Sequence, residues 1–122
     1  MIVALAQINP LIGDIAGNVR RIRESIDAAG RTGAHLVLFP ELTICGYPPK
    51  DLLLKPRFIN EMVSSLKSLA EETAKGPAAF VGFVRPSEKS VGRRVRNCLA
   101  LLKNGKVAAE ACKSLLPAYD VF

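Results

Sequence analysis

The arrangement of apolar and polar residues in the first third of the chain predicts a strand, a helix and a second strand. Residues 2–8 are almost wholly apolar, which is typical of a strand buried on both faces. A helix is predicted next, with Asn18 as its N-cap and Gly33 as its stop, because apolar residues recur there at spacings of three and four. Residues 36–39 form a second short strand that Pro40 ends. The apolar face of the helix comprises Val19, Ile22, Ile26 and Ala29.

The rest of the chain predicts a second helix, a third strand and a hairpin. Pro56 suits the first turn of a helix, and an amphipathic pattern follows it. After a strand at residues 79–84, the segments 97–102 and 107–112 flank the pair Asn104-Gly105, which is typical of a type I′ hairpin turn. The order strand, helix, strand implies parallel pairing, and the hairpin adds an antiparallel edge. We therefore predict an α/β fold with a mixed sheet.

Composition and charge narrow the classes of function. With 122 residues, 49% of them apolar, the chain suits one folded domain rather than a disordered segment. Residues 85–113 hold eight Lys or Arg against two Asp or Glu, which accounts for the net charge of +6. The basic segment Arg85–Arg96 has no interleaved aromatic residue, so nucleic-acid binding is not expected. We interpret this segment as a solvated loop, and leave open a contact with an acidic partner or a phosphorylated ligand.

Neither a membrane segment nor a metal site is expected. The uncharged stretch Met1–Gly13 is shorter than the ~20 apolar residues of a membrane span, and it lacks the basic start of a secretion signal. The three cysteines, Cys45, Cys98 and Cys112, are odd in number and form no C-x-x-C pair, which argues against a disulfide framework and against structural zinc. We expect reduced thiols and a cytoplasmic location.

Two charged residues lie where predicted strands end. Glu41 directly follows the second strand, at the carboxyl end where open α/β sheets place their ligand crevices. Lys113 directly follows the last strand of the hairpin. Taken singly, Glu41 is an ordinary loop carboxylate or helix cap and Lys113 an ordinary surface lysine. Only their joint occurrence with the motifs around them indicates a site.

These motifs are residues 38–42 (LFPEL), 46–53 (GYPPKDLL) and 113–122 (KSLLPAYDVF), preceded by an opening segment at residues 3–18. Together they resemble the nitrilase (carbon-nitrogen hydrolase) superfamily, and within it the N-terminal glutaminase domain of glutamine-dependent NAD synthetases. The resemblance implies part of a nitrilase-type αββα sandwich, with a mixed sheet and helices on one face. It covers the chain from end to end.

The resemblance also implies roles for individual residues. Glu41 matches the general base of a Glu-Lys-Cys triad, and Lys113 matches the residue that stabilises the oxyanion of the tetrahedral intermediate. Tyr47 falls in the segment that helps to shape the glutamine pocket or the ammonia route in the family, and Tyr119 and Phe122 fall in the segment after the lysine. Each of these three aromatic residues is equally well explained by packing.

The family's nucleophilic cysteine lies well downstream of its lysine, so we expect residues 1–122 to be a piece of the domain that is truncated before it. Cys98 and Cys112 lie in apolar strands, where a cysteine is typically a small buried hydrophobe. Cys45, four residues after Glu41, is the one cysteine placed to face the site, but nothing near it in sequence lowers its pKa. This chain alone is therefore expected to be inactive.

An intact protein of this family releases ammonia from glutamine and passes it to a synthetase domain, which uses ATP with Mg to amidate deamido-NAD. No cofactor is expected in residues 1–122, because they contain no glycine-rich phosphate loop. The expected partners are glutamine, the rest of the protein and further copies of the chain, with no nucleic acid and no membrane.

Two alternatives stay open. The chain can be a piece of a stand-alone amidase of the same superfamily, or a non-catalytic module that binds an acidic partner through Arg85–Arg96. Half of a sandwich would leave apolar sheet surface uncovered, so self-association or poor solubility is expected of the chain by itself.

Overall fold

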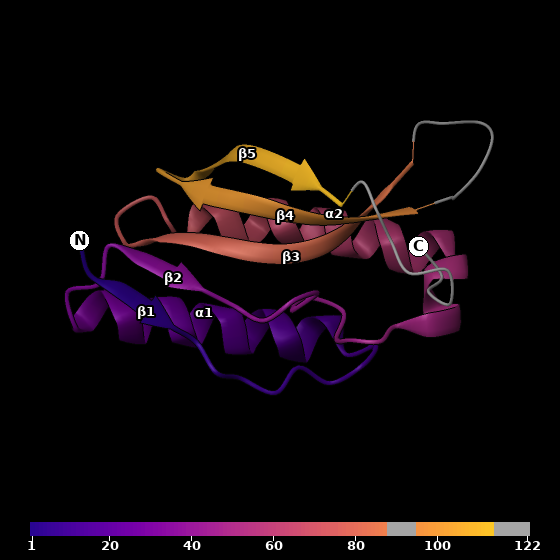
Figure 1. The fold of residues 1–122 in the computed structure, drawn as a ribbon, viewed down its shortest axis with the longest axis horizontal. Coiled ribbons are helices and arrows are strands. Elements are labelled where there is room, and N and C mark those ends of the chain that lie inside the picture. The colour runs from indigo at the N-terminus through magenta and orange to yellow at the C-terminus, as the bar shows by residue number, and fades with distance from the viewer. Residues whose placement is uncertain (88–94, 114–122) are drawn as a thin grey trace.

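The computed structural model describes residues 1–87 and 95–113, which form a single five-stranded sheet with two α-helices (Figure 1). The strands are arranged in the order β1-β2-β3-β4-β5. The pairs β1–β2 and β2–β3 are parallel, whereas β3–β4 and β4–β5 are antiparallel, so the predicted mixed sheet is confirmed. The elements are β1 (Val3–Leu5), α1 (Ile15–Arg31), β2 (Leu36–Leu38), the 3₁₀ helix η1 (Lys50–Leu54), α2 (Pro56–Glu71), β3 (Ala78–Pro86), β4 (Val95–Lys103) and β5 (Lys106–Cys112).

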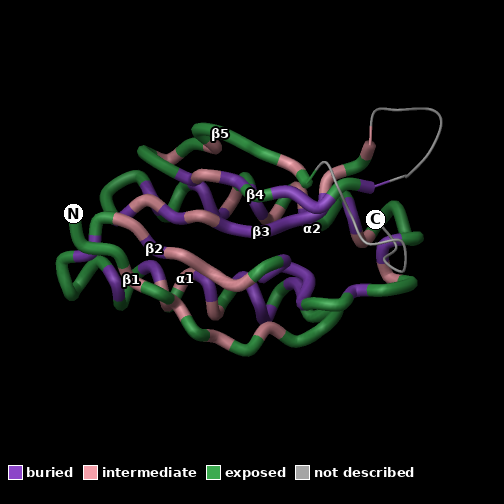
Figure 2. The backbone as a smooth tube through the Cα atoms, viewed as in Figure 1, coloured by how far each residue is buried: buried purple, intermediate pink, exposed green. Residues whose placement is uncertain are grey.

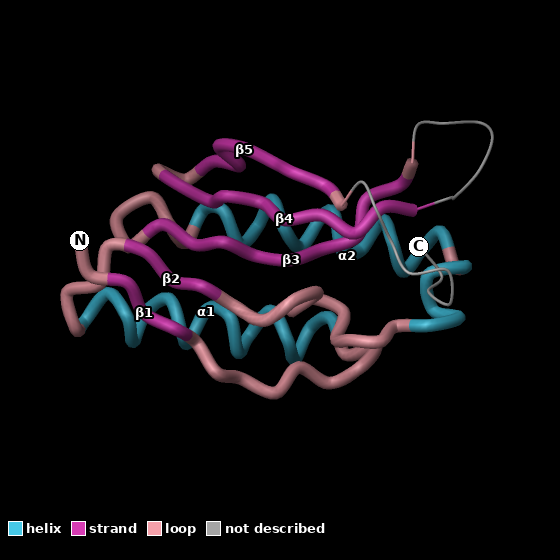
Figure 3. Tube along the Cα trace, in the orientation of Figure 1, coloured by secondary structure: helices cyan, strands magenta, loops and turns pink. Residues whose placement is uncertain are grey.

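Both helices lie behind the sheet in Figure 3, α1 near β1 and β2, and α2 near β3 and β4, as predicted for helices on one face. Successive side chains of a strand alternate between the two faces of a sheet, so each strand contributes to both. We call the side toward the helices the covered face. It is fully buried in the middle of the sheet, at Ala79, Val81, Phe83, Ala100 and Leu102.

The opposite side, which we call the open face, carries the alternate residues of the same strands, and no described helix packs on it. It includes the apolar residues Val3 and Leu5 of β1, Phe80 of β3, and Leu99 and Leu101 of β4. Leu5 is 69% exposed. Leu99 is 43% exposed, although Cys98 and Ala100 on either side of it are buried, and buried and exposed positions adjoin along β4 in Figure 2. The prediction that residues 2–8 are buried on both faces is therefore wrong, because β1 is an edge strand with only one face packed.

Helix α1 begins earlier than predicted. Asp14, not Asn18, is its N-cap, and its Oδ1 accepts a hydrogen bond from the backbone N–H of Gly17 at 3.0 Å. Asn18 lies within the helix and is fully buried. Its side chain accepts from the N–H of Leu11 (2.8 Å) and donates to the carbonyls of Leu11 (2.8 Å) and Ile44 (2.9 Å). It therefore joins the loop before α1 to the turn after β2.

Helix α2 has Pro56 at its first position, as predicted. The hairpin turn is also confirmed, because Asn104 and Gly105 both have positive φ angles, 53° and 80°. The register of the hairpin then changes. Leu102 pairs with Val107, but Leu101 pairs with Ala109, which leaves Ala108 as the extra residue of a β-bulge.

Candidate active site

Glu41 is placed by an abrupt turn after β2. The next residue, Leu42, is fully buried and has φ = 50°, a left-handed conformation that costs a non-glycine residue about 1 kcal/mol or more. The turn approaches β3 closely at Gly82, where an added Cβ would lie 2.5 Å from the backbone nitrogen of Leu42. Only glycine allows this approach, so Gly82 lets the turn hold Glu41 against the open face.

Lys113 is placed by the end of β5. Beyond the bulge, Leu99 pairs with Ala111 and Cys98 with Cys112, so Lys113 lies opposite Asn97 on β4. The backbone N–H of Lys113 donates to the carbonyl of Asn97 at 2.9 Å, which continues the ladder past the end of β5. Side chains opposite each other share a face, so Lys113 and Asn97 both belong to the open face.

The side chains of Glu41 and Lys113 are in contact, although 72 positions separate them in sequence. The ammonium of Lys113 donates to Oε1 of Glu41, and the side-chain amide of Asn97 donates to the same oxygen at 2.7 Å. The ion pair is about half exposed, with side-chain exposures of 48% for Lys113 and 44% for Glu41. The three residues therefore form one hydrogen-bonded group at the rim of the sheet.

The pKa of Glu41 is held below its ordinary value of 4.5, mainly by the hydrogen bond from Lys113. Partial burial of the carboxyl acts in the opposite direction, while the Asn97 hydrogen bond and the Lys113 charge lower the pKa further. Glu41 is therefore ionised at neutral pH, the form that can accept a proton.

A pocket of about 400 Å³ on the open face adjoins this group. The residues around it are mostly apolar, apart from the three that form the hydrogen-bonded group. Such a mixture of an apolar wall with a few convergent polar groups is typical of a small-molecule site. Its lining includes Glu41, Leu42, Gly82, Asn97, Leu99 and Lys113.

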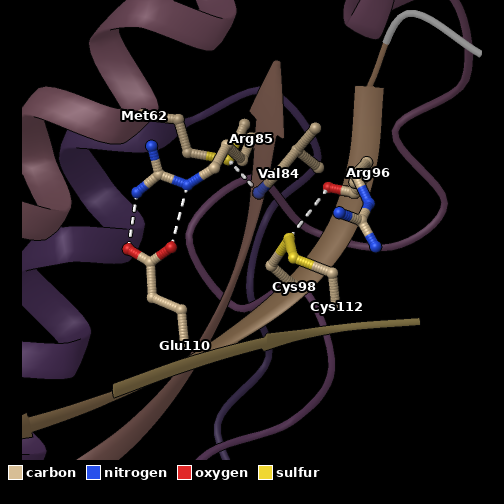
Figure 4. Close-up of a disulfide and its surroundings, with 7 residues drawn as sticks. All are labelled: Met62, Val84, Arg85, Arg96, Cys98, Glu110 and Cys112. Carbon is tan, nitrogen blue, oxygen red and sulfur yellow. Dashed lines mark hydrogen bonds and ion pairs between the residues drawn. A yellow bond between two sulfur atoms is a disulfide. The ribbon is translucent and has the colours of Figure 1, made fainter. Parts of the chain in front are cut away.

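The cysteines differ from the sequence expectation. Cys98 and Cys112 are joined in a disulfide between β4 and β5, so the prediction of reduced thiols is wrong for this pair (Figure 4). The bulge is the physical reason, because an uninterrupted hairpin would place Cys98 opposite Ala111 instead of Cys112. Cys45 is a free and fully buried thiol, as expected for a structural cysteine, and burial raises its pKa to about 12. None of the three is a thiolate at neutral pH.

Of the other predicted site residues, Tyr47 is the one within the described part of the chain. Tyr47 lies in the turn before η1, is 48% exposed, and is not among the described residues that line the pocket. Tyr119 and Phe122 lie outside the described residues, so their predicted roles stay predictions. Asn97 was missed by sequence reasoning. The one available signal was a lone amide within an otherwise apolar strand.

The ends of the basic segment belong to strands rather than to a loop. Arg85 on β3 forms a two-point ion pair with Glu110 on β5, at 2.9 and 2.5 Å (Figure 4). The guanidinium of Arg85 also lies over the ring of Phe83. Arg96 lies on β4, and residues 88–94 lie outside the described part. Part of the basic segment thus has a structural partner within the fold.

Across residues 1–87 and 95–113, no group of three His, Cys, Asp or Glu side chains is arranged to hold a metal ion. In the same part of the chain, no helix has the length and apolar character needed to cross a membrane.

The chain is similar to known proteins both in sequence and in fold. Residues 2–120 match a family model described as carbon-nitrogen hydrolase. A glutamine-dependent NAD(+) synthetase from Synechocystis sp. is 43% identical over 98% of this chain, and the match covers 22% of that protein. The structure of a glutamine-dependent NAD+ synthetase from Acinetobacter baumannii is 36% identical, with a TM-score of 0.78 over 98% of this chain and 22% of its own. An amidase from Nesterenkonia sp. is 25% identical, with a TM-score of 0.72 over 95% of this chain and 43% of its own.

Proposed function

Because the chain belongs to the carbon-nitrogen hydrolase family, we propose that Glu41 is the general base and Lys113 the oxyanion-stabilising cation of an amide-hydrolysing site. The observation that carries the proposal is the contact between the Lys113 ammonium and Oε1 of Glu41 beside the open-face pocket. The two charges come from separate strand ends, and each keeps the other ionised.

The proposed reaction is acyl transfer to a thiol. Glu41 accepts the thiol proton, and the sulfur forms a bond to the amide carbon. The negative charge that develops on the amide oxygen lies near the Lys113 ammonium, where an opposite charge stabilises it. Collapse of the intermediate breaks the C–N bond, and the proton held by Glu41 leaves with the amine as ammonia. Glu41 then takes a proton from water, and the water oxygen forms a bond to the thioester carbon. The C–S bond breaks to release the carboxylic acid, and the proton held by Glu41 returns to the sulfur to restore the thiol.

The thiol of this reaction is proposed to come from residues outside this sequence. Cys45 is buried with a pKa of about 12, and Cys98 and Cys112 are bonded to each other. In this proposal, residues 1–122 are the N-terminal part of a glutamine amidohydrolase domain. The remainder supplies the nucleophile and covers the apolar open face. The chain by itself is then inactive.

Glutamine is the proposed substrate. The chain spans about one fifth of the length of the glutamine-dependent NAD(+) synthetases that it matches at 43% and 36% identity. The ammonia would serve the amidation reaction of the longer protein. Its ATP, Mg and deamido-NAD would be bound by a synthetase domain outside residues 1–122. The similarity to an amidase supports a second candidate, a site that hydrolyses small amides.

The test is amide hydrolysis by a longer protein that contains this sequence. We expect Glu41→Gln and Lys113→Met each to lower glutamate release from glutamine by about 10²-fold or more, the usual contribution of a general base or an oxyanion donor. Glu61→Gln and Lys67→Met, two exposed changes on α2, are matched controls that should retain activity. Wild-type turnover in both site variants would contradict the proposal, and turnover of acetamide in place of glutamine would favour the amidase.

A further inference from the structure

Asn97 contacts both members of the Glu41–Lys113 pair. Its side-chain Nδ2 donates to Oε1 of Glu41 at 2.7 Å, and its backbone carbonyl accepts from the N–H of Lys113 at 2.9 Å. Asn97 is 4% exposed, whereas the two charged side chains are about half exposed. The most deeply buried member of the group is thus the neutral one.

An amide at this position is costly unless it is hydrogen-bonded, because burying it without a partner removes its bonds to water. The residues two positions away on the same face of β4, Val95 and Leu99, are both apolar, so an amide between them is not explained by apolar packing. The hydrogen bond to Glu41 therefore explains both the polar residue and its orientation.

Both donors reach the same carboxylate oxygen. Lys113 and Asn97 donate to Oε1, and within the described residues no bond to Oε2 is formed. Two donors on one oxygen fix the plane and direction of the carboxylate, since rotation about its bond would break both contacts. Oε2 thus has no hydrogen-bond partner within the described residues, and the Glu41 residue lines the pocket.

We infer that Asn97 is a positioning residue for the proposed hydrolysis: it anchors Oε1 of Glu41 against Lys113, so that Oε2 is the atom that accepts the proton. This inference rests on the proposed function of Glu41 and deepens it. Asn97 acts through Glu41 and through the backbone of Lys113, without touching the reacting atoms.

The electrostatic surroundings of Glu41 agree with this role. Among the described residues, Lys113 is the charged side chain that contacts Glu41. The Arg85–Glu110 pair lies on the covered side of the same strands, because Arg85 shares a face with Phe83 and Glu110 with Ala100. Along with Lys113, the Asn97 hydrogen bond lowers the pKa of Glu41.

The first test uses the 122-residue chain and does not depend on activity. We expect the pKa of Glu41, followed by carbon-13 NMR of its carboxyl, to rise in Asn97→Leu, which keeps the branched shape of the side chain and removes the donor. It should rise further in Asn97→Asp, which places a second carboxylate beside the first. Thr73→Val, which removes another buried hydrogen-bonding side chain away from the site, is the control and should leave the pKa unchanged. An unchanged pKa in both Asn97 variants would overturn the inference.

A measurement on the unaltered chain tests the inference even if the Asn97 variants do not fold. The side-chain NH₂ resonances of Asn97 should shift with pH at the midpoint of the Glu41 titration, and this shift should vanish in Glu41→Gln. If the NH₂ resonances of Asn97 do not shift at the midpoint of the Glu41 titration, the inference is overturned.

The second test uses a longer, active protein. We expect Asn97→Leu to lower kcat by about 10²-fold with little change in KM, and to move the acid limb of the pH profile upward, because misorientation of a base penalises the chemical step. If Glu41→Gln abolishes turnover while Asn97→Leu keeps the wild-type kcat and pH profile, the Asn97 inference fails. If Glu41→Gln itself keeps turnover, the proposed function fails, whatever the NMR result for Asn97.

Discussion

The two faces of the sheet are built from the same strands but have different roles. On the covered face, Val81, Phe83 and Leu102 are fully buried beneath the helices. On the open face, Leu99 is 43% exposed, and the polar group of Glu41, Asn97 and Lys113 lies beside it. The covered face supplies stability, and the open face carries the candidate chemistry, separated from it by the thickness of one sheet.

Neighbouring residues of one strand show how this separation arises. Gly82 allows the Glu41 turn to approach the open face, while the next residue, Phe83, is buried in the covered face. Asn97 and Cys98 divide in the same way on β4. Because strand side chains alternate, a substitution that affects the core and one that affects the site can be adjacent in sequence.

The largest expected contrast is between one apolar truncation on each face. Phe83→Ala should destabilise the chain by about 3–5 kcal/mol, because it removes a fully buried aromatic side chain and leaves a cavity. Leu99→Ala should cost about 1 kcal/mol or less, because Leu99 is already 43% exposed. Urea unfolding of the two variants and the parent chain measures both values. Equal losses would contradict the distinction between the faces.

A smaller effect is expected from breaking the link between β4 and β5. The Cys98–Cys112 disulfide closes a segment of sequence separation 14, and a loop of about that length contributes roughly 3 kcal/mol. Addition of a dithiol reductant should therefore lower the melting temperature of the chain. A variant with both Cys98→Ala and Cys112→Ala should melt at the same temperature with and without reductant. A parent chain that is equally insensitive to reductant would contradict the presence of the bond.

The smallest effect is expected from the ion pair on the open face. Because the pKa of Glu41 is lowered by folding, its stabilising contribution is present above the unfolded value and is lost as pH falls through the folded value. The pair is about half exposed, so the contribution should be under about 1 kcal/mol. Urea unfolding of the parent and Glu41→Gln should thus differ at pH 7 and converge below pH 4.5. A difference that grows on acidification would contradict this sign.

Much of the fold follows from local pattern. The helical spacing, Pro56 and the pair Asn104-Gly105 predicted α1, α2 and the hairpin turn, because each depends on residues close together in sequence. The resemblance drawn from the motifs around Glu41 and Lys113 is confirmed at the level of the family. The catalytic roles assigned to these two residues stay predictions.

What was missed depends on contacts between distant segments. Asn18 has the sequence signature of an N-cap, yet its side chain bonds to Leu11 and Ile44, and its role is visible only after the loops have folded together. Asn97 gains its partner from Glu41, 56 positions away. The bulge at Ala108 has no signature in its own sequence, and it determined both the cysteine pairing and the partner of Lys113.

Because Ala108 is an additional residue in β5, the number of residues between the turn and Lys113 decides which face of the sheet Lys113 occupies. In a regular ladder Lys113 would lie opposite Arg96, and its amine would project among the helices, away from Glu41. Loss or gain of one residue between Gly105 and Lys113 would move every later side chain of β5 to the opposite face of the sheet. A change of two residues would return these side chains to their original face. A change in the number of residues between the turn and Lys113 can therefore leave the amine on the same side of the sheet as the carboxylate only if the change is an even number.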